Sequence, residues 1–148
     1  MILSADEKVV AFLDGIEKLE YKHKYALLSS CSRPSELFAD NRLIERYFEK
    51  TGNVSAGRDL IRLHRDEEYA DEIAKKSVST ADAFVTMWSE DYPEELKRIP
   101  APPLALYCRG DIKLLKSENK FAIVGSRKTL GQYAAAHAKY PPRSRERA

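Results

Sequence analysis

The residue types with the clearest chemical potential occupy one short turn: Gly125, Ser126, Arg127 and Lys128. Residues 121–124 before it form a short apolar run, which is typical of a buried parallel strand. Residues 132–140 after it are rich in alanine and lack glycine and proline, so they predict a helix. A turn from a strand into a helix presents backbone N–H groups and the positive end of the helix dipole. We therefore expect an anion site, to which Arg127 and Lys128 add full positive charges.

The turn is not one of the well-known nucleotide motifs. Gly125 is not followed by the G-x-G-x-x-G spacing of dinucleotide-binding proteins, and the sequence is not a P-loop. Turns from a strand through a glycine into a helix occur in every α/β protein, and most of them bind nothing. On the turn alone, a phosphate site and a purely structural turn both stay open.

Charge is distributed unevenly along the 148 residues, although the net charge is only +2. Residues 113–148 carry nine Lys and Arg against two Glu, a local charge of +7, and the rest of the chain carries −5. A basic C-terminal part beside an acidic N-terminal part indicates a polyanion partner for the C-terminal end. The alternative, for Arg143, Arg145 and Arg147, is a charged tail without structure.

Composition excludes several classes of protein. No apolar run approaches the roughly 18 residues of a membrane span, and charged residues follow the first four positions, so neither a membrane segment nor a secretory signal is expected. Cys31 and Cys108 are far apart, which predicts free thiols in a cytoplasmic protein. The three histidines show no metal-ligand spacing, so we predict no metal site and no cofactor.

Residues 1–79 predict a small all-helical domain of the SAM or helix–hairpin–helix type. Ser4 and Glu7 have the spacing of a capping box, which opens the first helix. Asn41 and Gly52 have the residue types that begin and end a helix. Beside the helix that starts at the capping box, helical segments are expected at residues 22–29, near Pro34, at 42–51 and at 58–76.

A helix–hairpin–helix turn binds DNA phosphates through glycine amides, and the candidate turn spans Gly15 to Lys22. It lacks a second glycine, and it contains Glu17 and Glu20, which would repel phosphate. A docking or regulatory role of this domain is therefore favoured over direct DNA binding.

The pattern changes in residues 80–140, where short β-rich runs alternate with helical segments. This alternation predicts the opening of an α/β sheet with parallel character. Prolines exclude a helix or a central strand at residues 99–103. The expected elements are strands at 83–88, 104–109 and 120–124, a short helix from Pro93, a helical turn at 112–115 and a helix at 132–140.

A doubly wound sheet needs further strand–helix units after this point, but two prolines end the last helix. Residues 141–148 form a basic tail that we expect to be disordered. The sheet is therefore predicted to be incomplete, and a truncated or frameshifted product is the expectation from the sequence.

Four pieces of sequence, in order over about 45 residues, resemble the start of the DprA/Smf DNA-processing family. They share a proline- and leucine-rich pattern that leads into the Gly-Ser-Arg turn. The pieces are Tyr92-Pro93 with Leu96, residues 99–110, Leu114-Leu115, and residues 122–127 with Thr129. Any one of these pieces would be a weak signal, whereas their shared order and spacing are specific.

The resemblance implies a Rossmann-like core that binds single-stranded DNA, forms a homodimer and loads the RecA recombinase during natural transformation. It implies no enzymatic activity and therefore no catalytic residue. Carried over to this chain, it places Arg127 on the DNA backbone, with Gly125 and Ser126 as further donors. Lys128 joins this site by adjacency only. Most of the dimer surface implied by the family would lie in the missing C-terminal part.

Two alternatives of different classes stay open. One is a nucleotide-handling enzyme with a similar turn, such as a nucleoside-monophosphate phosphoribohydrolase. It needs a catalytic acid, for which the sequence offers Glu90, Asp91, Glu94 and Asp111 in turns. The other is a helical interaction module followed by a non-functional remnant of the DNA-processing domain.

Overall fold

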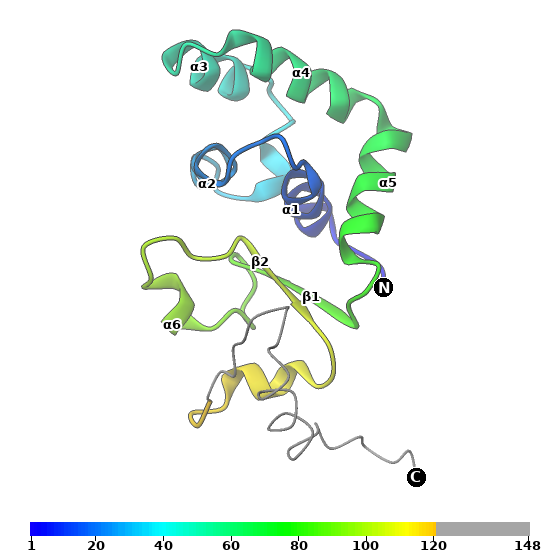
Figure 1. The fold of residues 1–148 in the computed structure, drawn as a ribbon, viewed down its shortest axis with the longest axis vertical. Helices are drawn as coiled ribbons and strands as arrows, with labels where there is room; N and C mark the ends of the chain where they lie inside the picture. Colours follow the sequence, from blue (N-terminus) through cyan, green and yellow to red (C-terminus); the bar gives the residue numbers. More distant parts are fainter. Residues whose placement is uncertain (121–148) are drawn as a thin grey trace, which may run out of the picture. The chain divides into compact units, whose positions relative to one another are not determined.

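The computed structural model describes residues 1–120, of which Met1–Ser117 form one compact unit (Figure 1). This part of the chain is mixed α/β and mostly helical. The elements are α1 (Ala5–Gly15), α2 (Tyr21–Ser29), η1 (Pro34–Glu36), α3 (Arg42–Lys50), α4 (Val54–Arg65), α5 (Glu67–Val78), β1 (Ala83–Thr86), α6 (Glu94–Lys97), β2 (Ala105–Cys108) and η2 (Ile112–Lys116). The strand predicted to follow Lys120, the helix at 132–140 and the tail at 141–148 lie outside the described residues.

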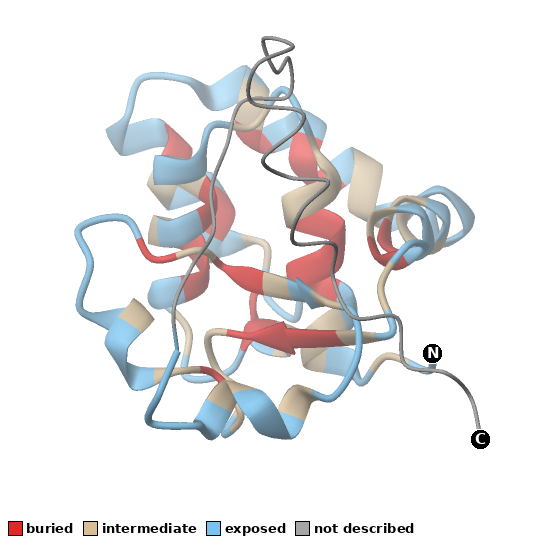
Figure 2. Cartoon of the chain, turned by 60° about the horizontal axis from the view of Figure 1, so that its bottom comes forward, coloured by how far each residue is buried: buried red, intermediate tan, exposed pale blue. Residues whose placement is uncertain are grey.

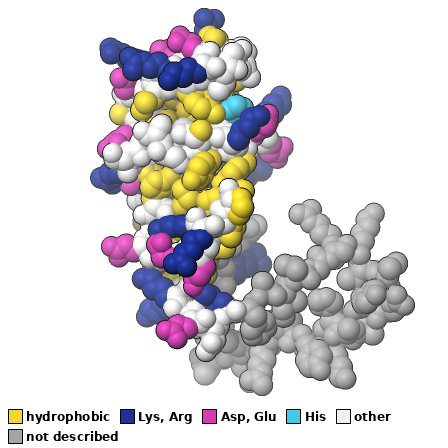
Figure 3. All heavy atoms as spheres, turned by 90° about the vertical axis from the view of Figure 1, so that its left-hand side faces the viewer, with side chains coloured by type: hydrophobic (Ala, Val, Ile, Leu, Met, Phe, Trp, Pro, Cys, Tyr) yellow, Lys and Arg dark blue, Asp and Glu magenta, His cyan; other side chains and the backbone are white. Residues whose placement is uncertain are grey.

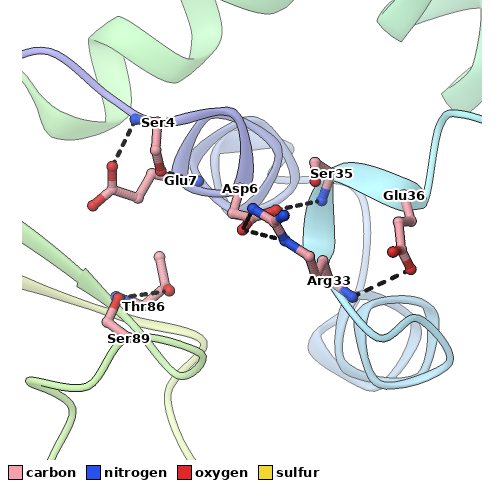
Figure 4. Close-up of polar contacts among 8 residues, drawn as sticks. All are labelled: Ser4, Asp6, Glu7, Arg33, Ser35, Glu36, Thr86 and Ser89. Atoms are coloured by element: carbon pink, nitrogen blue, oxygen red, sulfur yellow. Dashed lines mark hydrogen bonds and ion pairs between the residues drawn. The ribbon is translucent and has the colours of Figure 1, made fainter.

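Helix α1 begins at the predicted capping box. The amide of Glu7 donates to the Ser4 hydroxyl at 3.3 Å, and the amide of Ser4 donates to the Glu7 carboxylate at 2.7 Å (Figure 4). The reciprocal bonds satisfy two amides that the helix leaves without partners. Residues 9–13 of the helix are then buried, with Phe12 only 1% exposed.

Asp6 fastens η1 to the first turn of α1. Its carboxylate accepts hydrogen bonds from the Ser35 amide at 2.9 Å and from the Arg33 guanidinium at 3.0 Å (Figure 4). Hydrogen bonding to Ser35 is the main cause that lowers the pKa of Asp6, and Arg33 adds to it. The loop between α2 and α3 is thus held to α1 by a charge-assisted contact.

One buried cluster joins the helices to the strand pair. Figure 2 shows buried residues on the inner faces of the helices and in both strands. Phe84 of β1 and Ala105 of β2 belong to the same cluster as the apolar residues of α1 to α5. The largest fully buried side chains of the described residues are Phe12, Phe48, Leu13, Leu27, Leu28, Leu37, Ile44, Val10 and Pro34.

The single helix predicted at residues 58–76 is wrong, because the structure divides it into α4 and α5 at Asp66. Asp66 has non-helical backbone angles, φ −80° and ψ 90°, and its carboxylate accepts from the Tyr69 amide at 3.1 Å. It therefore ends α4 and caps α5, and the chain changes direction between the two helices (Figure 1). Apolar residues recur at helical spacing on both sides of this junction, so their periodicity does not reveal it.

The observed ends of α3 agree only in part with the ends predicted from the sequence. The helix starts directly after Asn41, but Asn41 makes no side-chain cap; the Asp40 carboxylate accepts from the Arg42 amide at 3.0 Å. Gly52 follows the helix with φ +75°, a conformation that glycine adopts at little cost. The predicted end of this helix is confirmed, and Asn41 is the N-cap residue by position without the side-chain hydrogen bond of a cap.

Strands β1 and β2 pair antiparallel, with a register from Ala83 opposite Cys108 to Thr86 opposite Ala105. The parallel character predicted for these two strands is therefore wrong. A parallel pair needs a crossover, usually a helix, that carries the chain back along a full strand. Between β1 and β2 the only helix is the four-residue α6, followed by the prolines of residues 99–103. A Rossmann-like parallel sheet stays a prediction, since the strand at 121–124 lies outside the described residues.

Polar contacts also connect the helices to the strands. The Tyr107 hydroxyl of β2 donates to the Asp14 carboxylate at 2.5 Å, and Lys24 donates to the Asp14 carbonyl at 2.8 Å. Desolvation, with the bond to Asp14, raises the pKa of Tyr107. Helices and strands thus share one body in Met1–Ser117, while a functional domain boundary at residues 79 and 80 stays a prediction.

His64 of α4 stacks on Phe38, with ring centroids 3.6 Å apart and planes 1° apart, and its edge meets Phe12. Burial lowers the pKa of His64 below its ordinary value of 6.5, and Glu67 opposes this shift only in part. The folded state therefore binds the proton less well than the unfolded state. The stability that His64 contributes is fully present above about pH 6.5 and is lost as the pH falls through the folded pKa.

We predict that the free energy of unfolding of the wild-type protein falls more between about pH 7.5 and pH 5.5 than that of His64→Gln. The glutamine variant lacks the titrating ring, and its lower starting stability does not affect the comparison of slopes. Urea unfolding at both pH values measures the slopes, and an NMR titration gives the midpoint of His64. A midpoint at or above 6.5 would contradict the prediction.

Candidate nucleic-acid interface

The residues predicted to contact phosphate, Gly125, Ser126, Arg127 and Lys128, lie outside the described residues. The structure does describe the segment that leads to them, from β1 to Lys120. The architecture of that segment is fixed by a few polar contacts, most of them to backbone groups.

Two tyrosines hold the proline-rich segment 99–103 between α6 and β2. The Tyr92 hydroxyl donates to the Pro103 carbonyl at 2.7 Å, and the Tyr21 hydroxyl of α2 donates to the Pro102 carbonyl at 2.5 Å. We call this pair the tyrosine clamp. Burial raises the pKa of both phenols, and Tyr92 is only 2% exposed. Tyr92 is thus a core residue.

The turn after β1 is closed by a serine. The Ser89 hydroxyl accepts from the Thr86 amide at 3.1 Å and bonds the Thr86 hydroxyl at 3.0 Å (Figure 4). Trp88 within this turn is half-buried and packs against the hydrophobic cluster. Its position favours a structural role over the stacking of a DNA base.

The chain leaves β2 through a second anchored turn. Arg109 donates through Nε to the Thr80 carbonyl at 2.7 Å, and the amide of Gly110 donates to the Asp82 carboxylate at 2.9 Å. Gly110 has φ +96°, which an L side chain rarely adopts, so glycine is required at this position. Asp111 then caps η2 by accepting from the Lys113 amide at 3.0 Å.

The described cations of this segment are partly neutralised. Lys116 pairs with Asp91 at 2.8 Å, and Lys97 pairs with Glu94 at 2.7 Å. The contact with Asp91 raises the pKa of Lys116. Both ion pairs include exposed side chains and so contribute little energy.

A comparison with protein families bears directly on this segment. Residues 83–145 match the family described as DNA recombination-mediator protein A. The match begins at the first residue of β1 and includes the anchored turns, η2 and the Gly-Ser-Arg turn. No curated protein and no solved structure matches the chain.

The match confirms the resemblance to the DprA/Smf family, and we call residues 83–145 the recombination-mediator segment. The motif residues of this segment that the structure describes have structural roles. Tyr92 of the tyrosine clamp donates to Pro103, and Gly110 makes the turn into η2. Sequence reasoning missed Tyr21, which lies 81 residues from Pro102 and belongs to no motif. No pattern in the sequence marks so distant a pair.

Three of the four carboxylates that the enzyme alternative would need have structural partners. Asp91 and Glu94 are ion-paired, and Asp111 is the cap of η2. Within residues 1–120, no group of His, Cys, Asp and Glu side chains is placed to hold a metal ion. The described residues therefore offer no observation that favours hydrolysis of a nucleotide.

The candidate helix–hairpin–helix turn is occupied by internal contacts. The amides of Ile16 and Leu19 donate to the carbonyls of Leu13 and Ile16, each at 3.2 Å. A Cβ at Gly15 would collide with Ser77 and Ile73 of α5, so this glycine serves helix packing. Both observations agree with the expectation that phosphate binding is not favoured at this turn. No helix in the described part of the chain is both long and apolar enough to cross a membrane.

We predict that Tyr92→Phe lowers the free energy of unfolding by about 0.5–1.5 kcal/mol, because the Pro103 carbonyl loses its donor while the ring stays in place. Tyr25→Phe is the matched control: Tyr25 is 36% exposed, and among the described contacts its hydroxyl has no hydrogen bond. That control should stay within about 0.5 kcal/mol of wild type. Equal effects of the two variants in urea unfolding would refute the role given to Tyr92.

Proposed function

We propose that this chain is a recombination mediator that binds single-stranded DNA, with Gly125, Ser126, Arg127 and Lys128 as its phosphate contacts. The observation that carries the proposal is the family match over residues 83–145, which includes this turn. The local charge of +7 in residues 113–148 supports a polyanion partner.

The chemistry of the turn suits a DNA backbone. The guanidinium of Arg127 has a fork of donors that matches two phosphate oxygens, and each well-held charge-assisted bond contributes about 1.5–3 kcal/mol. The amides of Gly125 and Ser126, together with the Ser126 hydroxyl, would add neutral donors. Because every nucleotide carries the same phosphate, such a site binds DNA irrespective of its sequence.

We infer further, from the family, that the chain assists the RecA recombinase and protects incoming DNA during natural transformation. The proposed protein is cytoplasmic, forms a homodimer and acts without catalysis or a cofactor. A RecA filament assay on oligonucleotide coated with single-strand-binding protein tests the RecA part. Faster filament growth is expected, and an unchanged growth rate at saturating chain would contradict it.

We predict that Arg127→Ala weakens binding to a single-stranded oligonucleotide at low salt and reduces the slope of log K against log salt by about 0.7, the share of one phosphate contact on single-stranded DNA. Fluorescence anisotropy at several salt concentrations measures both quantities. Arg58→Ala is the matched control, since Arg58 is an exposed arginine of α4 that makes no ion pair within residues 1–120.

The control removes the same charge and should leave affinity and slope close to wild type. Equal loss in the two variants would show a diffuse effect of net charge, which contradicts a specific role of Arg127. A wild-type slope retained by Arg127→Ala would likewise exclude a phosphate contact at this residue.

A further inference from the structure

Helix α2 carries a pair of stacked and exposed tyrosines. The rings of Tyr21 and Tyr25 lie 5.8 Å apart with planes 24° apart, and the two residues are 37% and 36% exposed. Their spacing of four residues places them on one face of the helix. A contiguous exposed apolar surface is a candidate interaction site.

The loop before β2 extends this surface. The bond between the Tyr21 hydroxyl and the Pro102 carbonyl brings residues 98–101 beside α2, and all four of these residues are exposed. Ile99 is 43% exposed. We call Tyr21, Tyr25, Ile99 and Pro100 the α2 aromatic surface. Figure 3 shows hydrophobic side chains gathered on the face that carries α2 and this loop.

Cations border the α2 aromatic surface. Lys22 follows Tyr21 directly, and its contact with Glu20 at 2.9 Å joins two side chains that are about two-thirds exposed. Such a pair contributes little energy and leaves the Lys22 ammonium accessible, while the neighbouring Glu20 carboxylate lowers the local affinity for phosphate. Arg98 is exposed and makes no ion pair in the described part of the chain. Glu94 of α6 pairs with Lys97.

We propose that the α2 aromatic surface stacks the bases of single-stranded DNA. This would be a second DNA contact, in addition to the one proposed for residues 125–128. The inference rests on the proposed function and deepens it. Aromatic rings offer a face to any base, and nearby cations meet the phosphates between stacked bases. The clamp supports such a contact because it fixes the Tyr21 ring and joins α2 to the recombination-mediator segment. A hydrophobic protein partner would leave Lys22 and Arg98 without a role.

The test uses the full chain and a fluorescent oligo-dT probe at several salt concentrations. Tyr25→Leu is the informative variant, because Tyr25 is exposed and lies outside the clamp. Tyr69→Leu is the matched control, since Tyr69 is 41% exposed on α5. We expect Tyr25→Leu to weaken binding about fivefold or more with an unchanged salt slope, because it removes stacking and no charge. The control should bind like wild type.

Photo-cross-linking gives an independent readout. An oligonucleotide with 5-iododeoxyuridine should cross-link to Tyr25 or Tyr21 and not to Tyr69, as mapped by mass spectrometry. Wild-type affinity in Tyr25→Leu would overturn the inference, as would equal loss in Tyr69→Leu or cross-links confined to other regions. If in that case Arg127→Ala still weakens binding, the proposed function stands without this surface. Absence of binding by the wild-type chain would overturn both.

Discussion

Two phenol hydroxyls hold the proline-rich segment on which the described architecture depends. Pro100, Pro102 and Pro103 have no amide hydrogens, so these three residues cannot donate to a β-ladder, and the carbonyls of Pro102 and Pro103 accept from donors outside the segment. Tyr92 supplies one donor from beside α6, and Tyr21 supplies the other from α2. The segment therefore joins the helices to β2.

Several cations of the recombination-mediator segment are bonded to carboxylates or carbonyls of the chain itself. Lys97 and Lys116 are paired with carboxylates, and Arg109 is bonded to a backbone carbonyl. Such residues position the chain, whereas the residues proposed for DNA contact follow later, at 125–128. In the recombination-mediator segment, the motif residues that the structure describes thus stabilise the fold. The proposed phosphate contacts all belong to residues 125–128.

Local chemistry made much of the fold predictable. The Ser4–Glu7 box, the glycine after α3 and the short helix after Pro93 each follow from backbone preferences of a few residues. The break at Asp66 was missed because the helical period continues through it. The antiparallel strand pair was missed because pairing direction depends on the path of the connection. Tyr21 could not be assigned from the sequence, since its partner is remote. The turn at 125–128 is predicted because glycine, serine and arginine at a strand end have a recognisable chemistry, and both its conformation and its role stay predictions.

The central claim is that the intact wild-type chain binds single-stranded DNA through phosphates. The most direct measurement is its affinity for oligo-dT and for a mixed-sequence oligonucleotide of equal length, by anisotropy over a range of salt concentrations. The account predicts similar affinities for the two sequences and a linear fall of log K with log salt. Absence of binding at low salt, or an affinity that salt leaves unchanged, would contradict it.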